Sequence, residues 1–384
     1  MKKLKKIAVI VLIFLTGTFS GVSQTQTPEI AFLGKIQFKP GVNEYYKNVN
    51  KAEWQIVKGN YSKASGYYSK AFKYKEPFSI DLRRAIIAEY LSDRDSATIV
   101  NYFILKIKIR YTPTDITEKL EEYGNYYPEL IKMKYWKSLP RILETVKIQF
   151  LREDALSDAL DSLSEADQRI RMEGIAKYTQ PKLYKAPYAD TIRTVDSINI
   201  TKLIALWEKY GEISERKAPS AESNLEVLIM HATKWHDTRW LKYLKIQLGN
   251  GTLDNKVYSR LIDRCILNEY SQLINTDKSD FFGTSMGFTL YNKYLAYRIS
   301  NEKEKEINNR RKQVCLSSFQ KEQEKSRWQF RQNIANFNLN FLFYTNSFMD
   351  FEENATEEMI KQYNAEQNKI IKRYNEKDIK LYNR

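Results

Sequence analysis

The chain has 384 residues and a formal net charge of +15, from 62 lysines and arginines against 47 acidic residues. Positive and negative side chains are interleaved, as in NEKEKEINNRRKQ, which favours a solvated mixed-charge surface, so we expect no nucleic-acid partner. Only 9 prolines and 13 glycines interrupt the chain, and long amphipathic stretches dominate it. We therefore expect an all-α fold, with stacked helical hairpins first, then a helical domain, then a charged helical C-terminal tail.

Residues 1–23 have the order of a secretory signal peptide. Four lysines precede an apolar run at 7–15, and small residues follow, with Gly21 and Ser23 fitting a cleavage site. The apolar run is shorter than the roughly 20 residues that span a bilayer, although an uncleaved anchor is the alternative. Cleavage would lower the net charge to +11, because this stretch contains no acidic residue. We expect an exported protein, periplasmic or secreted, without a stable membrane span after cleavage.

Cys265 and Cys315 are the only cysteines. Export permits a disulfide between them, and two buried thiols are the alternative. The chain has no C-x-x-C metal spacing, no phosphate-binding glycine loop and no dinucleotide fingerprint. We therefore expect no metal and no cofactor.

Residues 24–145 are expected to form a helical-repeat region, because small residues recur there at an offset of 33. The first set is Ala52, Gly59 and Ala64, and the second is Ala85, Ser92 and Ala97. The stretch GNYSKASGYYSKAFKY resembles the second half of a tetratricopeptide unit, a helix-turn-helix pair of about 34 residues. A generic helical hairpin is the alternative. A further pair at 116–143 is plausible but carries no marker.

Amphipathic periodicity predicts helices through the next region, residues 146–290. The expected ranges are 146–178, 196–210, 221–235, 241–247 and 255–270. Prolines interrupt TQPKLYKAPYADT and GEISERKAPSAES, which we expect as loops. In the tail, residues 291–384, the alternating apolar residues at 337–343 fit a strand or a buried helix. Asn354 begins a last helix in the manner of a capping box.

The chain contains only two histidines, His231 and His236. His231 follows Val227 and Leu228 by four and three residues, so it lies on the buried side of its helix. His236 is rotated about 140° away, so the two do not form a metal pair. A buried imidazole beside a carboxylate could act as a general acid or base, and a core histidine with satisfied nitrogens is the alternative.

Asp167 also falls on an apolar helical face, which it shares with Leu163 and Ile170. Arg171 is one turn further along and can pair with it.

The run from 151 to 284 resembles a bacterial domain of unknown function. Its members show D-Q-x-x-R, D-x-x-N, a helical histidine, L-x-D-R, a glutamine and an aromatic-Gly-Thr. The matching residues here are Asp167, Gln168, Arg171, Asp196, Asn199, His231, Leu261, Asp263, Arg264, Gln272, Phe282, Gly283 and Thr284. This chain departs from the pattern at an extra LINTDKSD before Phe282 and at ERKAPSAES, where a Val-Gly turn is expected. The resemblance implies which residues could form a site, but it does not imply a reaction.

These residues define the candidate site. The catalytic candidates are His231, Asp167 and Asp263, and the binding candidates are Gln168, Arg171, Asp196, Asn199, Arg264 and Gln272. Hydrolases use such sets to position water and neutralise an anion, and a structural network of buried ion pairs would use the same residues. Asp196 and Asn199 could instead cap a helix. Asp263 lies opposite the apolar stripe of its own helix, so we expect it exposed unless a second layer covers it.

Two functions remain open at this stage. The leading hypothesis is an exported helical-repeat protein that binds a protein or peptide partner in the cell envelope through a concave face. Aromatic residues that could line this face, although such residues are more often core, are Tyr45, Tyr46, Tyr67, Tyr68 and Tyr74. The alternative is a hydrolase-like enzyme with His231 as base, Asp167 or Asp263 orienting it, and Arg171 or Arg264 holding an anionic substrate. An open cleft uniting His231 with both carboxylates would favour the enzyme, and a closed, paired cluster the scaffold.

Overall fold

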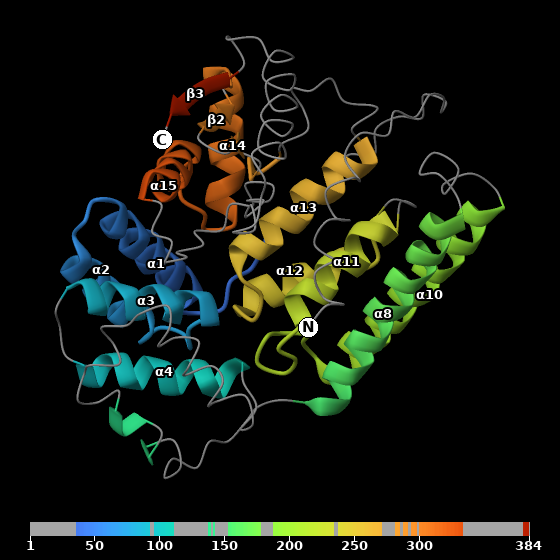
Figure 1. Ribbon diagram of the computed structural model, residues 1–384, viewed down its shortest axis with the longest axis horizontal. Helices are drawn as coiled ribbons and strands as arrows, with labels where there is room; N and C mark the ends of the chain where they lie inside the picture. The colour runs from blue at the N-terminus through green and yellow to red at the C-terminus, as the bar shows by residue number, and fades with distance from the viewer. Residues whose placement is uncertain are drawn as a thin grey trace, which may run out of the picture.

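The computed structural model describes the greater part of the chain between residues 36 and 332, and one segment near its end. The described ranges are 36–92, 96–110, 137–139, 141–142, 153–177, 187–233, 237–270, 281–284, 287–290, 293–297, 299–332 and 379–383. Helices dominate these ranges, as predicted (Figure 1). The predicted signal peptide, the alternating segment at 337–343 and the helix expected from Asn354 lie outside them.

The elements fall into successive groups along the chain. The first group is α1 (Val42–Val57), α2 (Tyr61–Ala71), α3 (Ser79–Leu91) and α4 (Ser96–Arg110). The second is α8 (Asp154–Lys177), α10 (Tyr188–Tyr210), α11 (Ala221–Thr233), α12 (Leu241–Asn250) and α13 (Asn255–Tyr270). The last is α14 (Asn301–Gln313) and α15 (Phe319–Gln332), with strands β1 (Gly287–Leu290), β2 (Lys293–Tyr297) and β3 (Ile379–Asn383). The strands form a small antiparallel sheet in the order β1-β2-β3, which the sequence did not predict.

The first four helices stack in chain order, each packing on the next. Small residues permit this close approach: Ala52 and Ala64 are fully buried in the first pair, and Ala85 is fully buried in the second. The stack is compatible with the predicted helical repeats. In Figure 1 it lies on one side of the molecule, with α8 and α10 on the other and α11–α13 between them.

Helices from later in the chain cover part of the surface of α1. Helix α15 packs on α1, and the fully buried Glu53 of α1 is bonded to Lys325 of α15 and Lys256 of α13. Three of the tyrosines expected to line an open concave face, Tyr45, Tyr46 and Tyr68, are core residues, and only Tyr74 among the five is exposed. The contact role expected of these three tyrosines is therefore wrong.

Helix α10 begins earlier than expected. Its first residue, Tyr188, follows directly after Pro187, the last proline of the expected loop, and no proline or glycine interrupts the chain from there to Tyr210. Proline is tolerated at a helix start and not inside it. Asp196 and Asn199 therefore lie in the middle of α10, and their interpretation as a helix cap is wrong.

One hydrophobic cluster joins the regions that the sequence separates. It extends from Val42 in α1 to Leu316 beyond α14. The Tyr46 hydroxyl donates to the Leu253 carbonyl at 3.0 Å, and Asn255 Nδ2 donates to the Val314 carbonyl at 3.0 Å. The expected boundaries at 145 and 290 stay predictions, and the described core continues across them. No helix within the described ranges combines the length and apolar character that a membrane span requires.

Cys315 is a free cysteine, so the disulfide to Cys265 that the sequence allowed is not formed. Its Sγ lies 3.0 Å from Asn43 Oδ1. Burial, and to a lesser extent the charge of Glu44, raises the pKa of the Cys315 thiol to about 11. The thiol is therefore protonated, and a poor nucleophile, at neutral pH.

Substitution of alanine for glycine should have opposite effects on stability at two helical positions, Gly66 and Gly249. A Cβ added at Gly66 of α2 would meet nothing within 4 Å, so Gly66→Ala should stabilise the protein by about 0.5–1 kcal/mol through lower backbone entropy. A Cβ at Gly249 of α12 would lie 2.3 Å from the Gln37 carbonyl oxygen, so Gly249→Ala should destabilise it by about 1–3 kcal/mol. Urea denaturation of the two variants measures both changes. Equal effects would show that residue 37 does not pack on α12.

Candidate functional site

Three mutually packed helices bring most of the predicted polar residues together. Helix α8 supplies Asp167, Gln168 and Arg171, helix α10 supplies Asp196 and Asn199, and helix α11 supplies His231. All except Gln168 and His231 are buried, with at most 4% of each residue exposed. The prediction that Asp167 lies on the buried face of its helix, where it can pair with Arg171, is thus confirmed.

Arg171 holds the two carboxylates. Its Nη1 lies 2.8 Å from Asp167 Oδ1, and its Nη2 lies 2.7 and 2.8 Å from the two oxygens of Asp196. Both terminal nitrogens are therefore engaged by the protein itself. A guanidinium suits this position because its planar fork binds carboxylates in a fixed geometry.

His231 completes the cluster through Asp167. Its Nδ1 lies 2.8 Å from Asp167 Oδ2, which also accepts from Gln168 Nε2 at 2.8 Å. About 20% of the His231 side chain is exposed, whereas 1% of the Asp167 side chain is. Solvent can therefore reach the cluster at the imidazole, and also at the exposed Gln168.

The charges around His231 set its protonation state. Burial and the positive charge of Arg171 lower the pKa of His231 below its usual value, against the opposing effect of Asp167. Burial alone would raise the pKa of Asp167, but its hydrogen bond with His231 and the charges of His231 and Arg171 bring it below the usual value. At neutral pH the carboxylate is an acceptor only, so Nδ1 carries the imidazole proton and Nε2 keeps a lone pair. This is the state of a general base.

Two buried donors of the cluster have no hydrogen-bond partner among the described residues: Arg171 Nε and Asn199 Nδ2. Asn199 is one turn beyond Asp196 on α10. A buried unsatisfied donor costs about 1–3 kcal/mol, so an acceptor supplied at either nitrogen would bind favourably.

Asp263 is bonded elsewhere. It is fully buried on α13, where its carboxylate accepts from the Phe282 and Thr284 amides at 2.7 and 2.8 Å and from the Thr284 hydroxyl at 2.7 Å. A second layer does cover Asp263, because the loop at 281–284 packs on that side of the helix, but the covered carboxylate bonds to this loop and not to His231. Asp167, and not Asp263, is the carboxylate hydrogen-bonded to His231.

Two other predicted site residues cannot be placed in this site. Gln272 lies outside the described residues, as does His236, which was not predicted to join the site. Arg264 belongs to α13, but the description does not extend to its side chain. Their roles stay predictions.

A second buried cluster, centred on Glu53, was missed at the sequence level. Its carboxylate pairs with Arg84 Nη1 at 2.7 Å, with Lys325 Nζ at 2.5 Å, and with Lys256. Burial opposes its ionisation, but these three cations hold the pKa of Glu53 far below its usual value. The sequence could have predicted the burial of Glu53, because this residue shares a helical face with Val49 and Ile56.

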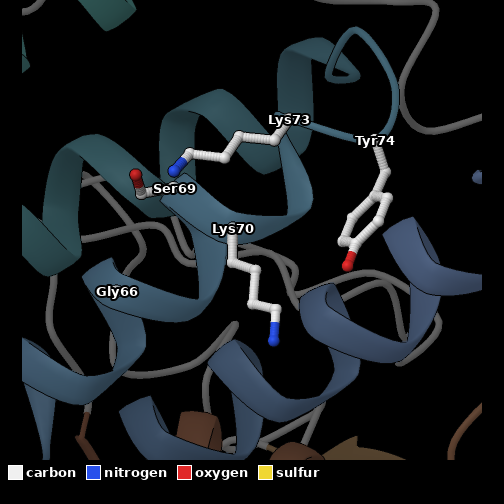
Figure 2. Close-up of a pocket in the computed structure, with 5 residues that line it drawn as sticks. All are labelled: Gly66, Ser69, Lys70, Lys73 and Tyr74. Atoms are coloured by element: carbon white, nitrogen blue, oxygen red, sulfur yellow. The ribbon is translucent and has the colours of Figure 1, made fainter.

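An open hollow of about 420 Å³ lies on α2 and the turn that follows it (Figure 2). It is lined by Gly66, Ser69, Lys70, Lys73 and Tyr74, all exposed. Sequence reasoning singled out Tyr74 only. The hollow is separate from the His231 cluster, because it lies on the repeat stack.

A scan against protein-family models found no match, and searches of curated proteins and of solved structures found none either. The class of protein is therefore defined by its architecture, a helical protein whose first helices stack in consecutive order.

Loss of Arg171 should destabilise the fold strongly. Arg171→Met would leave two buried carboxylates without their cation, and the expected loss is about 3–5 kcal/mol. Arg169→Met is the matched control, because Arg169 is exposed on the same helix and should change stability by no more than about 0.5 kcal/mol. Denaturant titrations of both variants measure the difference. Similar losses would contradict a central role for Arg171.

His231 should titrate below the usual histidine pKa. Because the unfolded chain then binds a proton that the folded chain does not, stability should fall as pH drops from about 6.5 through the folded-state pKa. NMR of the two imidazoles measures this titration, with His236→Gln to assign the signals. A His231 pKa above 6.5 would contradict the lowering by burial and the Arg171 charge, and a proton on Nε2 at neutral pH would contradict the hydrogen bond to Asp167.

Proposed function

We propose that the chain is an exported helical-repeat protein that binds a protein or peptide partner in the cell envelope. The observation that carries the proposal is the position of the open hollow. It lies on the α1–α4 stack and all its lining residues are exposed, whereas the carboxylates around His231 are buried and paired. Open surfaces on stacked helix pairs suit binding of an extended partner.

The N-terminal sequence supports the location. The basic, apolar and small-residue segments of residues 1–23 follow the order of a signal peptide. Export would place the mixed-charge surface of the remaining chain in contact with other envelope proteins.

A second candidate function, a hydrolase-like enzyme, rests on the Asp167–His231 pair. The 2.8 Å contact at Nδ1 and the partly exposed imidazole suit a general base that activates water. Three elements of the pattern compared above with a bacterial domain of unknown function meet here, although no family model supports that resemblance. Arg171 is less suited to hold an anionic substrate, since both its terminal nitrogens already bind carboxylates.

Affinity capture tests the leading proposal. The chain without residues 1–23, immobilised at its C-terminus, should retain a partner from an envelope extract in saturable amounts, and the purified partner should rebind it. His231→Gln should retain the same partner, because the open surface is remote from the His231 cluster. If only proteins that also adhere to the heat-unfolded chain are retained, the chain is not an interaction module. Loss of the partner in His231→Gln alone would favour a function at the His231 cluster.

A further inference from the structure

Helix α2 and the turn after it form a locally basic segment. Residues 61–75 include Lys63, Lys70, Lys73 and Lys75 and no acidic residue. Lys75 turns inward, with its Nζ 3.6 Å from the centre of the Phe78 ring. The other three lysines are exposed. Lys63 and Lys70 are seven residues apart and lie on one side of α2, whereas Lys73 lies in the turn after the helix.

Gly66 opens a hollow on this side. It lies one turn after Lys63 and one turn before Lys70, and a side chain there would meet nothing within 4 Å. In Figure 2 the Lys73 side chain extends back along the helix toward Ser69, and Tyr74 lies at the other end of the hollow. Tyr74 is 43% exposed, so an aromatic surface adjoins the two lysines.

No carboxylate of the described part of the chain forms an ion pair with Lys70 or Lys73. The acidic residue nearest in sequence, Glu76, pairs with Arg216 at 2.5 Å. By contrast, the buried Lys256 and Lys325 are both paired with Glu53. The positive charge on α2 is therefore available to a partner.

We propose that this hollow docks an acidic segment of a protein partner, with Asp or Glu carboxylates on Lys70 and Lys73 and an apolar side-chain stem against Tyr74. The inference rests on the proposed interaction function and names the chemistry of its partner. The lining offers the ammonium groups of Lys70 and Lys73, the hydroxyls of Ser69 and Tyr74 and the Tyr74 ring, so its charge complements that of a carboxylate. An open hollow of about 420 Å³ admits side chains from a passing segment.

Fluorescence anisotropy with the chain lacking residues 1–23 tests the proposal. The probe is a labelled eight-residue peptide that alternates Glu with Gly, and its matched control replaces every Glu with Gln. We expect saturable binding of the Glu peptide that weakens as salt rises, and at least tenfold weaker binding of the Gln peptide. Equal binding of the two peptides would overturn the proposal.

Charge reversal locates the binding site. Lys70→Glu with Lys73→Glu should weaken binding of the Glu peptide at least tenfold. The matched control, Lys202→Glu with Lys305→Glu, makes the same charge change at exposed positions on α10 and α14 and should keep binding within about twofold. Equal losses in the two double variants would mean that net charge alone attracts the peptide, and the docking site would be rejected.

Gly66→Gln fills the hollow without changing the charge. Because Gly66 is an exposed position inside a helix, the substitution should not lower the melting temperature, so weaker binding would not reflect unfolding. We expect at least a fivefold loss of affinity for the Glu peptide. Unchanged affinity would show that the hollow is not where the peptide lies.

Two further outcomes separate this proposal from its alternatives. Binding to phosphatidylglycerol vesicles without binding to the Glu peptide would assign the lysines to a membrane surface and overturn the peptide proposal. An envelope partner retained equally by the wild type and the Lys70→Glu, Lys73→Glu variant would preserve the interaction function while rejecting this docking site.

Discussion

The Glu53 carboxylate is the point on which the arrangement of the helices depends. It is fully buried and bonded to Arg84, Lys256 and Lys325, which come from α3, α13 and α15. A buried carboxylate is strongly destabilising unless its partners are in place, so the ion pairs constrain how these helices can pack on α1. Removal of one cation would leave a mismatched charge in the core. The stacked helices α1–α4 and the helices α13 and α15 are therefore joined around this carboxylate.

Arg171 constrains helix packing in the same way, but here a buried cation pairs with two buried carboxylates. One guanidinium lies between the carboxylates of Asp167 and Asp196, and so joins α8 to α10. Asp167 holds the His231 proton on Nδ1, and burial together with the positive charge of Arg171 lowers the pKa of His231. The chemistry available at His231 thus depends on a structural ion pair. Arg171 and Asp167 both stabilise the fold and set the protonation of His231. A substitution at either residue would therefore change stability and any catalysis together, and only substitutions or titrations of His231 separate the two.

Charges inside and outside the protein have different consequences. The buried lysines at 256 and 325 are paired with acids of the chain, whereas Lys70 and Lys73 border an open hollow without a described ion-pair partner. The first pair fixes the packing of helices, and the second can attract an acidic segment from solution. The open hollow lies on α2 and the turn after it, whereas Lys256 of α13 and Lys325 of α15 bond to the buried Glu53 of α1.

Local sequence periodicity determined the helices and which side of each is apolar, since side chains three and four residues apart share a face. It therefore predicted the burial of Asp167 and its pairing with Arg171, whereas His231, expected on the buried side of its helix, keeps about 20% of its side chain exposed. It could not determine that Asp196 lies opposite Arg171, 25 residues away, or that Lys325 reaches Glu53 across 272 residues. It also left open whether a second layer covers Asp263, because the covering loop begins beyond the end of its helix, with Phe282 19 residues further along the chain. Only the tertiary structure decides which charged faces meet, because ion pairing depends on the packing of whole helices and not on the spacing within one.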